Sequence, residues 1–361
     1  MTTLDKRFAA LRPRIDLDTA NALDDALSAL APGDTAAELV DAARDSVRSG
    51  KRLRALLAHF GASLGSGTPL GDGDVHLLGA ALELYQASAL VHDDLIDKAL
   101  TRRGIATPHV RFARAHAHSS WSGSAPDFGA AAAVLLGDLL FSAAESAMIR
   151  QSQRLPHDRA VRLLARYALM HSEVALGQYL DVRAENLPLR AFGPSVSDAR
   201  EVVLRKSARY SVVQPTLLGA AAAGADEDVL HALESALTPW GIAFQLRDDD
   251  LGVFGDPEVT GKPAGDDIRE GKRTVLLALT WENASEAERL RLERALGNPE
   301  PGPEELTAAA DIIEARGRAD HEHLIEALIE EGARALDDSP LAPKTRSELL
   351  ELSRIITART S

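Results

Sequence analysis

The chain has 361 residues, of which 45% are hydrophobic and 26% are charged, with 26 Gly and 17 Pro. This balance is typical of a globular protein and excludes a collagen-like or disordered chain. Acidic residues outnumber basic ones by 54 to 40, and the formal net charge of -14 argues against nucleic acid or an anionic membrane as a partner. Because there is no cysteine, disulfides, thiolate metal sites and a cysteine nucleophile are excluded.

The N-terminal residues predict neither export nor organelle import. The first eight residues contain no apolar segment and include an acid, Asp5. The longest apolar stretch, Ala130 to Gly137, is far shorter than the roughly 20 residues that span a bilayer. We therefore expect a cytoplasmic protein with no integral membrane span.

The hydrophobic pattern indicates an all-α fold. Apolar residues recur at three- and four-residue spacing, good helix formers dominate, and no run of alternating β-branched residues predicts a strand. The expected helices cover residues 16–31, 36–49, 51–64, 74–98, 107–118, 130–153, 157–181, 197–224, 226–236, 239–254, 272–283, 285–296, 303–316, 319–336 and 343–358.

Three segments rich in Gly, Ser or Pro interrupt this pattern: Ser119–Gly129, Glu185–Ser197 and Gly255–Gly271. Each is short, and the helical pattern is the same on both sides, so residues 1–361 are expected to form a single domain. Pro215 cannot donate a hydrogen bond to the carbonyl of Ser211, and it should therefore kink its helix.

An acidic motif, Asp93-Asp-Leu-Ile-Asp97, lies at the end of an apolar helix. Asp93 and Asp97 are one turn apart on the same face, where two carboxylates can share a divalent cation. Gln86 lies two turns earlier on that face, and Arg102 and Arg103 follow, with guanidinium groups that suit phosphate oxygens. The alternative is a solvated helix face with a basic C-terminal end.

A second acidic motif, Asp248-Asp-Asp250, also lies in an apolar helix, and a glycine-rich segment with Lys262 and Lys272 follows it. The glycine spacing does not match a P-loop. Mg²⁺ is typically held by one or two carboxylates together with substrate phosphates, so two such helices facing each other across a diphosphate make chemical sense. The alternative is a charged surface loop.

The segment Gly50-Lys-Arg-Leu-Arg54 opens a helix and places Lys51 and Arg54 on one face beside free backbone N–H groups. This arrangement suits a diphosphate, although a solvated basic face is the alternative. Among five histidines, two pairs have a spacing of two residues and so do not share a helix face, and we expect all five to be solvated rather than metal ligands. They are His109, His116, His118, His321 and His323.

Together and in this order, these segments resemble the polyprenyl synthetase family, the trans-isoprenyl diphosphate synthases. The matching segments are Gly50-Lys-Arg-Leu-Arg54, Asp93-Asp-Leu-Ile-Asp97 with Arg102-Arg-Gly104, Val134-Leu-Leu-Gly-Asp138, Gly177-Gln-Tyr-Leu-Asp181, Lys206-Ser207, Phe244-Gln-Leu-Arg-Asp-Asp249, Gly261-Lys262, Asp267 and Gly271-Lys-Arg-Thr274. The resemblance implies a bundle of mostly antiparallel helices around a central cavity, a homodimer, and head-to-tail condensation of isopentenyl diphosphate with dimethylallyl, geranyl or farnesyl diphosphate.

The resemblance also implies residue roles. Mg²⁺, three ions per active site, is held by Asp93, Asp97 and Asp248, and Asp94 and Asp249 belong to the same catalytic motifs. The allylic diphosphate is held by Arg102, Lys206 and Lys262, and Lys272 is a further substrate-binding residue. Isopentenyl diphosphate is bound by Lys51, Arg54, Gln86 and Arg103. Ser207 and Gln245 present oxygens to the allylic cation, and the departing diphosphate takes the final proton.

The chain departs from the usual family pattern at four positions: Ser49, Gln86, Ser207 and Gly252. The first three keep the chemistry. Gly252 removes one carboxylate from the second motif, so we expect this motif to hold its metal mainly through Asp248, with Asp249 acting through water.

Product length in this family depends on side chains one or two turns before the first aspartate motif. Ser88 and Ala89 are small there, and Tyr85, about 40° round the helix from Ala89, is the first bulky residue. We expect a product beyond fifteen carbons, namely C20 geranylgeranyl diphosphate. The alternatives are a longer-chain or C15 synthase, and a non-catalytic regulatory subunit, although such subunits generally lose the aspartates. A terpene cyclase would lack the Lys51 segment and the second aspartate motif.

Overall fold

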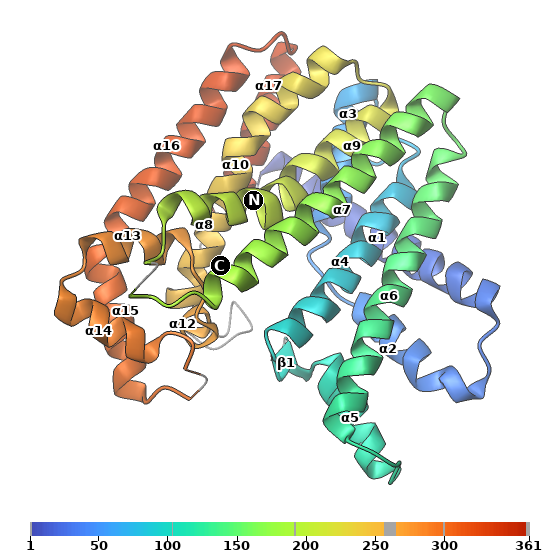
Figure 1. Ribbon diagram of the computed structural model, residues 1–361. Coiled ribbons are helices and arrows are strands. Elements are labelled where there is room, and N and C mark those ends of the chain that lie inside the picture. The colour runs from blue at the N-terminus through green and yellow to red at the C-terminus, as the bar shows by residue number, and fades with distance from the viewer. Residues whose placement is uncertain (1, 103, 191–192, 256–264, 299, 359–361) are drawn as a thin grey trace. The chain divides into compact units, whose positions relative to one another are not determined.

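The computed structural model describes the chain except residues 1, 103, 191–192, 256–264, 299 and 359–361 (Figure 1). In the described part, the only strands are two of two residues each, so the all-α prediction is confirmed. The elements are α1 (Thr3–Leu30), η1 (Asp34–Ala36), α2 (Ala37–Val47), α3 (Leu53–Ser66), α4 (His76–Ile96), β1 (Thr101–Arg102), β2 (Ile105–Ala106), α5 (Pro108–His118), α6 (Ala125–Ser152), α7 (His157–Glu185), α8 (Val196–Val202), η2 (Val203–Val213), α9 (Gln214–Ala223), α10 (Glu227–Phe254), α12 (Asp266–Glu270), α13 (Val275–Asn283), α14 (Glu286–Ala295), α15 (Pro303–Arg316), α16 (Arg318–Asp337) and α17 (Pro343–Thr357).

The chain forms two compact units. Unit 1 consists of residues 1–166 and 215–226, and unit 2 consists of residues 167–214 and 227–361. The chain passes from one unit to the other within α7, near the start of α9, and at the start of α10. The single-domain organisation of residues 1–361 stays a prediction.

Helix α1 begins thirteen residues earlier than expected. Its N-terminus is a capping box, in which the Thr2 hydroxyl accepts from the Asp5 N–H and the Asp5 carboxylate accepts from the Thr2 N–H. Leu4, Phe8, Leu11 and Ile15 then form a buried stripe at helical spacing. Pro13 lies inside the helix and does not end it.

The two helices expected at 226–236 and 239–254 are one continuous helix, α10. Pro239 lies inside it and lacks the N–H that would bond the carbonyl of Ser235. The Thr238 hydroxyl donates to the carbonyl of Glu234, the residue before Ser235. The apolar face of α10 is buried on both sides of Pro239. Tertiary packing therefore outweighs the local cost of Pro239.

The helix expected at 197–224 changes its hydrogen-bond register. An α-helical start, α8, gives way to the π-helical segment η2, and the α register resumes in α9 at Gln214, immediately before Pro215. Pi-helical turns occur frequently at functional sites, because they displace side chains from the regular helical face. Lys206 and Ser207 lie within η2.

In unit 1, α4 packs against α1, α3 and α6. Its first four turns are buried almost throughout, whereas its last turn carries the acidic motif and is partly exposed. Helices α3 and α9 cross in close contact, because a β-carbon at Gly61 would overlap the carbonyl of Thr216 and one at Gly219 would overlap that of Ala58. Glycine at these two positions permits the crossing.

In unit 2, α10 packs against η2, α16 and α17. Ala243 and Leu246 of α10 are fully buried with Val275, Ile325 and Leu328 in one apolar cluster. This core holds the second acidic motif, which lies in the last two turns of α10.

The expectation of solvated histidines is wrong at two positions. His116 is buried against Trp121 and Phe128, with ring centroids 5.9 and 5.3 Å away, and its Nε2 lies 3.1 Å from the carbonyl oxygen of Ser122. His321 is buried in α16. Both form part of packed surfaces that sequence spacing alone does not reveal.

Helix α6 is long and apolar enough to cross a membrane by length and composition, although the core helix of a globular protein meets the same criterion. The expected stretch 130–137 is only part of it, since α6 begins at Ala125 after the cap Ser124. Val134 and Leu135 on this helix are 43% and 61% exposed.

Candidate active site

The first aspartate motif lies at the C-terminal end of α4 in unit 1. Asp93 and Asp97 are partly exposed and one turn apart, and the N–H of Asp97 donates to the carbonyl of Asp93 at 2.8 Å. Asp94 is buried, so its side chain points away from the surface that the other two carboxylates share. Gln86 lies on the same helix, two turns earlier, and is partly exposed.

Arg102 lies on the β1–β2 hairpin and binds the motif directly. Its Nε donates to Asp94 Oδ1 at 2.6 Å, and its Nη2 lies 3.5 Å from Asp93 Oδ2. The hairpin turns at Gly104, whose φ of +74° favours glycine. Asp94 therefore orients Arg102 beside the two more exposed carboxylates. Arg103 is outside the described residues.

The segment at the start of α3 is fixed by its central residue, Arg52. This side chain is only 4% exposed, and its Nε donates to Asp16 Oδ1 at 2.6 Å while Nη2 donates to the carbonyl of Val47 at 2.5 Å. Its Nη1 lies 3.6 Å from Glu83 Oε2. Arg52 also has a positive φ of 55°, which is uncommon for a residue with a side chain.

Because Arg52 is buried, its neighbours Lys51 and Arg54 lie closer to the surface. Lys51 precedes α3 and is exposed, and Arg54 is partly exposed in the first turn of the helix. Glu83 completes the arrangement, because its Oε1 accepts from the N–H of Ala55 at 3.1 Å and so caps α3. Arg52 and Glu83 had no role in the sequence-based assignment, although Arg52 lies inside the matching motif.

The residues expected to limit product length lie on the buried side of α4. Tyr85 is 7% exposed and packs edge-to-face against Phe141 of α6, with ring centroids 5.8 Å apart. Burial raises the pKa of Tyr85, and the nearby Arg54 opposes this shift. Ser88 is buried and Ala89 partly buried. The first bulky side chain is therefore supported from a second helix.

The second aspartate motif lies in the last two turns of α10 in unit 2. Asp248 is exposed, whereas Asp249 is buried and its Oδ1 accepts from Gln245 Nε2 at 2.9 Å. Asp249 Oδ2 is buried and has no hydrogen-bond partner. Burial raises the pKa of Asp249 well above its ordinary value, and the neighbouring carboxylate of Asp267 raises it further.

The third carboxylate, Asp250, faces away toward α16. Arg318 holds it with Nε and Nη2 at 3.0 and 3.2 Å. One turn earlier, Arg247 binds both carboxylate oxygens of Glu322 at 2.5 and 2.8 Å. These two pairs fix the end of α10 against α16, which holds Asp248 and Asp249 in place.

A charged network in unit 2 contains two of the predicted lysines. Lys206 Nζ lies 2.5 Å from Asp181 Oδ2, and Lys272 Nζ lies 3.7 Å from the same oxygen and 2.8 Å from Glu185 Oε1. Asp181 therefore brings Lys206 and Lys272 together. It lies in a segment that matches the family, but it had no role in the sequence-based assignment. Ser207 follows Lys206 in η2 and is partly exposed.

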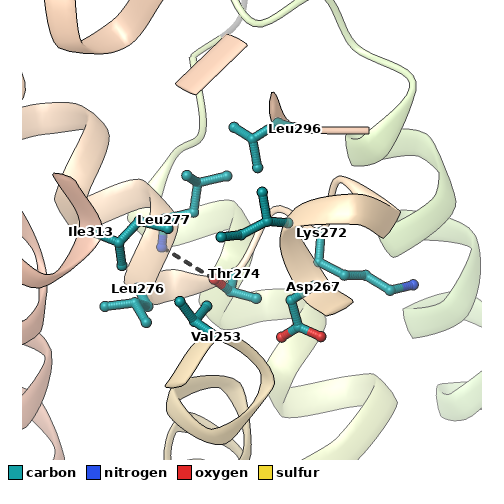
Figure 2. Close-up of a pocket in the computed structure, with 9 residues that line it drawn as sticks. Val253, Asp267, Lys272, Thr274, Leu276, Leu277, Leu296 and Ile313 are labelled. Carbon is teal, nitrogen blue, oxygen red and sulfur yellow. Dashed lines mark hydrogen bonds between the residues drawn. The ribbon is translucent and has the colours of Figure 1, made fainter. Parts of the chain in front are cut away.

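Lys272 also lies at a small pocket beside α12 (Figure 2). The pocket has an apolar lining that includes Val253 and Leu276, with Asp267 and Lys272 at its polar side. The neighbouring lysine of the glycine-rich segment, Lys262, is outside the described residues.

The comparisons with known proteins agree with these motifs. A family model described as "Polyprenyl synthetase" matches residues 36–313. The chain belongs to the polyprenyl synthetase family. Its structure is similar to geranylgeranyl pyrophosphate synthase from Corynebacterium glutamicum complexed with isoprenyl diphosphate and magnesium, with a TM-score of 0.86, 35% identity, and coverage of 96% of this chain and 99% of that one.

Two curated relatives show the range of the polyprenyl synthetase family. Geranylgeranyl diphosphate synthase of Sulfolobus acidocaldarius is 31% identical over 294 residues, which cover 81% of this chain and 82% of that protein. Geranylfarnesyl diphosphate synthase of Aeropyrum pernix is also 31% identical, over 306 residues that cover 84% of this chain and 88% of that protein. The overall identity is the same to these two synthases, so it does not distinguish between their products.

This polyprenyl synthetase is a prenyltransferase, and its family uses isoprenoid diphosphate substrates and is generally metal-dependent. The carboxylates suit a divalent cation, since Asp249 Oδ2 is buried without a partner beside other acids. In the described part of the chain, no three His, Asp or Glu side chains converge on one point. Mg²⁺ is usually bound by one or two carboxylates, together with substrate phosphates and water.

Proposed function

We propose that this chain condenses isopentenyl diphosphate head-to-tail with dimethylallyl, geranyl or farnesyl diphosphate, and that its product is C20 geranylgeranyl diphosphate. The main support is that cations suited to a diphosphate are held by carboxylates in both units, by the first aspartate motif in unit 1 and by Asp181 in unit 2. Arg102 lies 2.6 Å from Asp94 in unit 1, and Lys206 lies 2.5 Å from Asp181 in unit 2. A diphosphate needs cations of this kind, and its metal needs the carboxylates.

In this proposal, Asp93, Asp97 and Asp248 hold Mg²⁺, with three ions in the active site. When bound, Mg²⁺ offsets the negative charge that develops on the leaving diphosphate. Arg102, Lys206 and Lys262 hold the same diphosphate. Asp94 orients Arg102 through the 2.6 Å contact, and Asp181 orients Lys206.

The two cations at the start of α3 bind the second substrate. Lys51 and Arg54 take the diphosphate of isopentenyl diphosphate, with Gln86 and Arg103, while the buried Arg52 keeps the segment in position. The allylic C–O bond breaks, and a C–C bond forms to the double bond of isopentenyl diphosphate. The resulting cation loses a proton from the neighbouring carbon, which forms the new double bond, and the released diphosphate takes this proton. Ser207 and Gln245 direct oxygens at the allylic cation, and Gln245 is itself held by its bond to Asp249.

The contact between Tyr85 and Phe141 supports a C20 product. Ser88 and Ala89 are small enough for the growing chain to pass, and the edge-to-face pair one turn deeper forms a floor. A C25 or longer product would need that pair to move aside.

We also propose that the protein is a cytoplasmic homodimer. Helix α6 exposes apolar residues, with Val134 and Leu135 at 43% and 61%, and a second copy would cover them. Light scattering should give the mass of two chains, and a Leu135→Glu variant should shift that mass toward one chain.

An assay with three allylic primers separates the candidate functions. The purified chain is incubated with isopentenyl diphosphate and each primer, with and without Mg²⁺, and the products are extracted with and without phosphatase treatment. We expect prenyl diphosphates only when both substrates and Mg²⁺ are present. Consumption of the primer alone would indicate a terpene cyclase, and no reaction would indicate a non-catalytic subunit.

A further inference from the structure

The segment η2 is π-helical from Val203 to Val213, and it carries Lys206 and Ser207. Pi-helical structure is rare in proteins and usually extends over a single turn within an α-helix. A segment of this length therefore needs tertiary contacts that hold its hydrogen-bond register. In unit 2, η2 makes such contacts with both α7 and α10.

Arg209 links η2 to these two helices. Its Nε donates to Glu173 Oε2 of α7 at 2.9 Å, and its Nη1 donates to Glu234 Oε1 of α10 at 2.8 Å. The three side chains are 18%, 14% and 31% exposed, so the solvent screens these ion pairs less than pairs on an open surface. One guanidinium therefore ties the π-helical segment to two helices that are distant from it in sequence.

The contact with α7 continues along one face of that helix. Glu173, Gly177 and Asp181 follow one another at intervals of four residues, which places them one turn apart on the same side of α7. A β-carbon at Gly177 would lie only 2.4 Å from the backbone nitrogen of Lys206, so the backbone of η2 lies directly against α7 there. One turn further along, Asp181 binds Lys206 Nζ at 2.5 Å. The pair of Arg209 with Glu173 thus lies next to the point at which η2 presents Lys206.

We propose that Arg209 is a positioning residue for the allylic diphosphate. By binding Glu173 and Glu234, it holds η2 in the π-helical register that directs Lys206 toward that substrate. This inference rests on the proposed function, which assigns Lys206 to the allylic diphosphate. Isopentenyl diphosphate is assigned to residues of unit 1, so the loss of Arg209 should weaken the binding of the allylic substrate and leave that of isopentenyl diphosphate unchanged.

The test compares Arg209→Met with Arg205→Met. Methionine keeps most of the apolar stem of arginine and removes the guanidinium. Arg205 is the matched control because it lies in η2 beside Lys206, but its ion pair is with Glu201, one turn earlier, and these two side chains are 33% and 44% exposed. Calorimetry with Mg²⁺ and farnesyl thiodiphosphate, which is not turned over, measures the affinity. We expect Arg209→Met to weaken it about tenfold and Arg205→Met to change it less than about twofold.

Steady-state kinetics provide a second measurement. In Arg209→Met, the KM for farnesyl diphosphate should rise about tenfold, whereas the KM for isopentenyl diphosphate should change less than about twofold. A purely structural role would instead reduce the amount of active protein, and so lower kcat while both KM values stay the same. Arg209→Lys keeps one positive charge and should recover part of the affinity for the allylic substrate.

Melting temperatures show whether each variant is folded. If Arg209→Met does not fold, Arg209→Lys takes its place in the comparison with Arg205→Met, with an expected loss of about threefold. Equal affinities of the Arg209 and Arg205 variants for the analogue, or equal increases in the two KM values, would overturn the inference. If the unmodified chain does not bind the analogue with Mg²⁺, the proposed function fails, and this inference fails with it.

Discussion

The guanidinium of Arg52 lies 3.6 Å from the carboxylate of Glu83, and both side chains are almost completely buried in unit 1. Each also holds the start of α3, Arg52 through the carbonyl of Val47 and Glu83 through the N–H of Ala55. The pair therefore fixes the segment that contains the exposed Lys51 and the partly exposed Arg54, which we assign to isopentenyl diphosphate.

Replacing Arg52 with Ala should leave Glu83 as an unpaired buried charge and lower the free energy of unfolding by about 3 kcal/mol. Chemical denaturation measures this change. Arg48→Ala is the control, because Arg48 is 79% exposed in its pair with Asp45, and it should cost no more than about 0.5 kcal/mol. Similar denaturation midpoints for Arg52→Ala and Arg48→Ala would show that Arg52 does not hold the start of α3 in place.

Stability should fall as the pH is lowered from neutrality. Burial lowers the pKa of His59 and that of His321 to about 4, whereas an unfolded histidine titrates near 6.5. Between these values the unfolded chain binds more protons, so stability is complete above pH 6.5 and is lost progressively toward pH 4. Each histidine contributes up to about 3 kcal/mol to this loss.

The variant His59→Leu tests the origin of this pH dependence. Both ring nitrogens of His59 are buried without a partner, so leucine removes the proton-binding group without breaking a hydrogen bond. Melting curves between pH 7.5 and 5 should then show a smaller decrease than in the unmodified chain. The control is the same substitution at the exposed His323. An unchanged pH profile in His59→Leu would assign the loss to other groups.

The end of α10 should depend on its ion pair with α16. Arg318 binds Asp250 at 3.0 Å and Glu314 at 2.5 Å, and it lies 4.3 Å from the ring centroid of Phe254, so Arg318→Ala removes three contacts at once. We expect a loss of about 1 kcal/mol in stability and a lower turnover number, because Asp248 and Asp249 lose part of their support. Arg334→Ala on the same helix is the control, since Arg334 is 68% exposed and its ion pair with Glu330, one turn earlier, is 3.5 Å long. Equal effects of the two variants would contradict the positioning role.

Product length should change in opposite directions at two positions on α4. Ala89→Phe places a bulky side chain one turn nearer the aspartate motif and should shorten the product to fifteen carbons or fewer. Tyr85→Ala removes one side of the contact with Phe141 and should allow products longer than C20. Chromatography of the dephosphorylated products measures both. If neither variant changes the product length, residues other than Tyr85 and Ala89 limit it.

The sequence predicted the helical class and the motifs well, because hydrophobic spacing and motif order are local properties. Helix boundaries were less predictable. The expected start at residue 16 and the expected break between residues 236 and 239 were wrong, because α1 continues through Pro13 and α10 through Pro239. Long-range roles were the least predictable. Nothing at Arg209 indicates that carboxylates of α7 and α10 bind it, since that depends on how η2 packs against these two helices.

The most direct test of the account is the mass of the product formed from farnesyl diphosphate and isopentenyl diphosphate with Mg²⁺. One head-to-tail addition should give C20 geranylgeranyl diphosphate as the main product, and removal of Mg²⁺ with a chelator should abolish its formation. Unchanged farnesyl diphosphate after incubation, or a product formed equally well without the metal, would contradict the account.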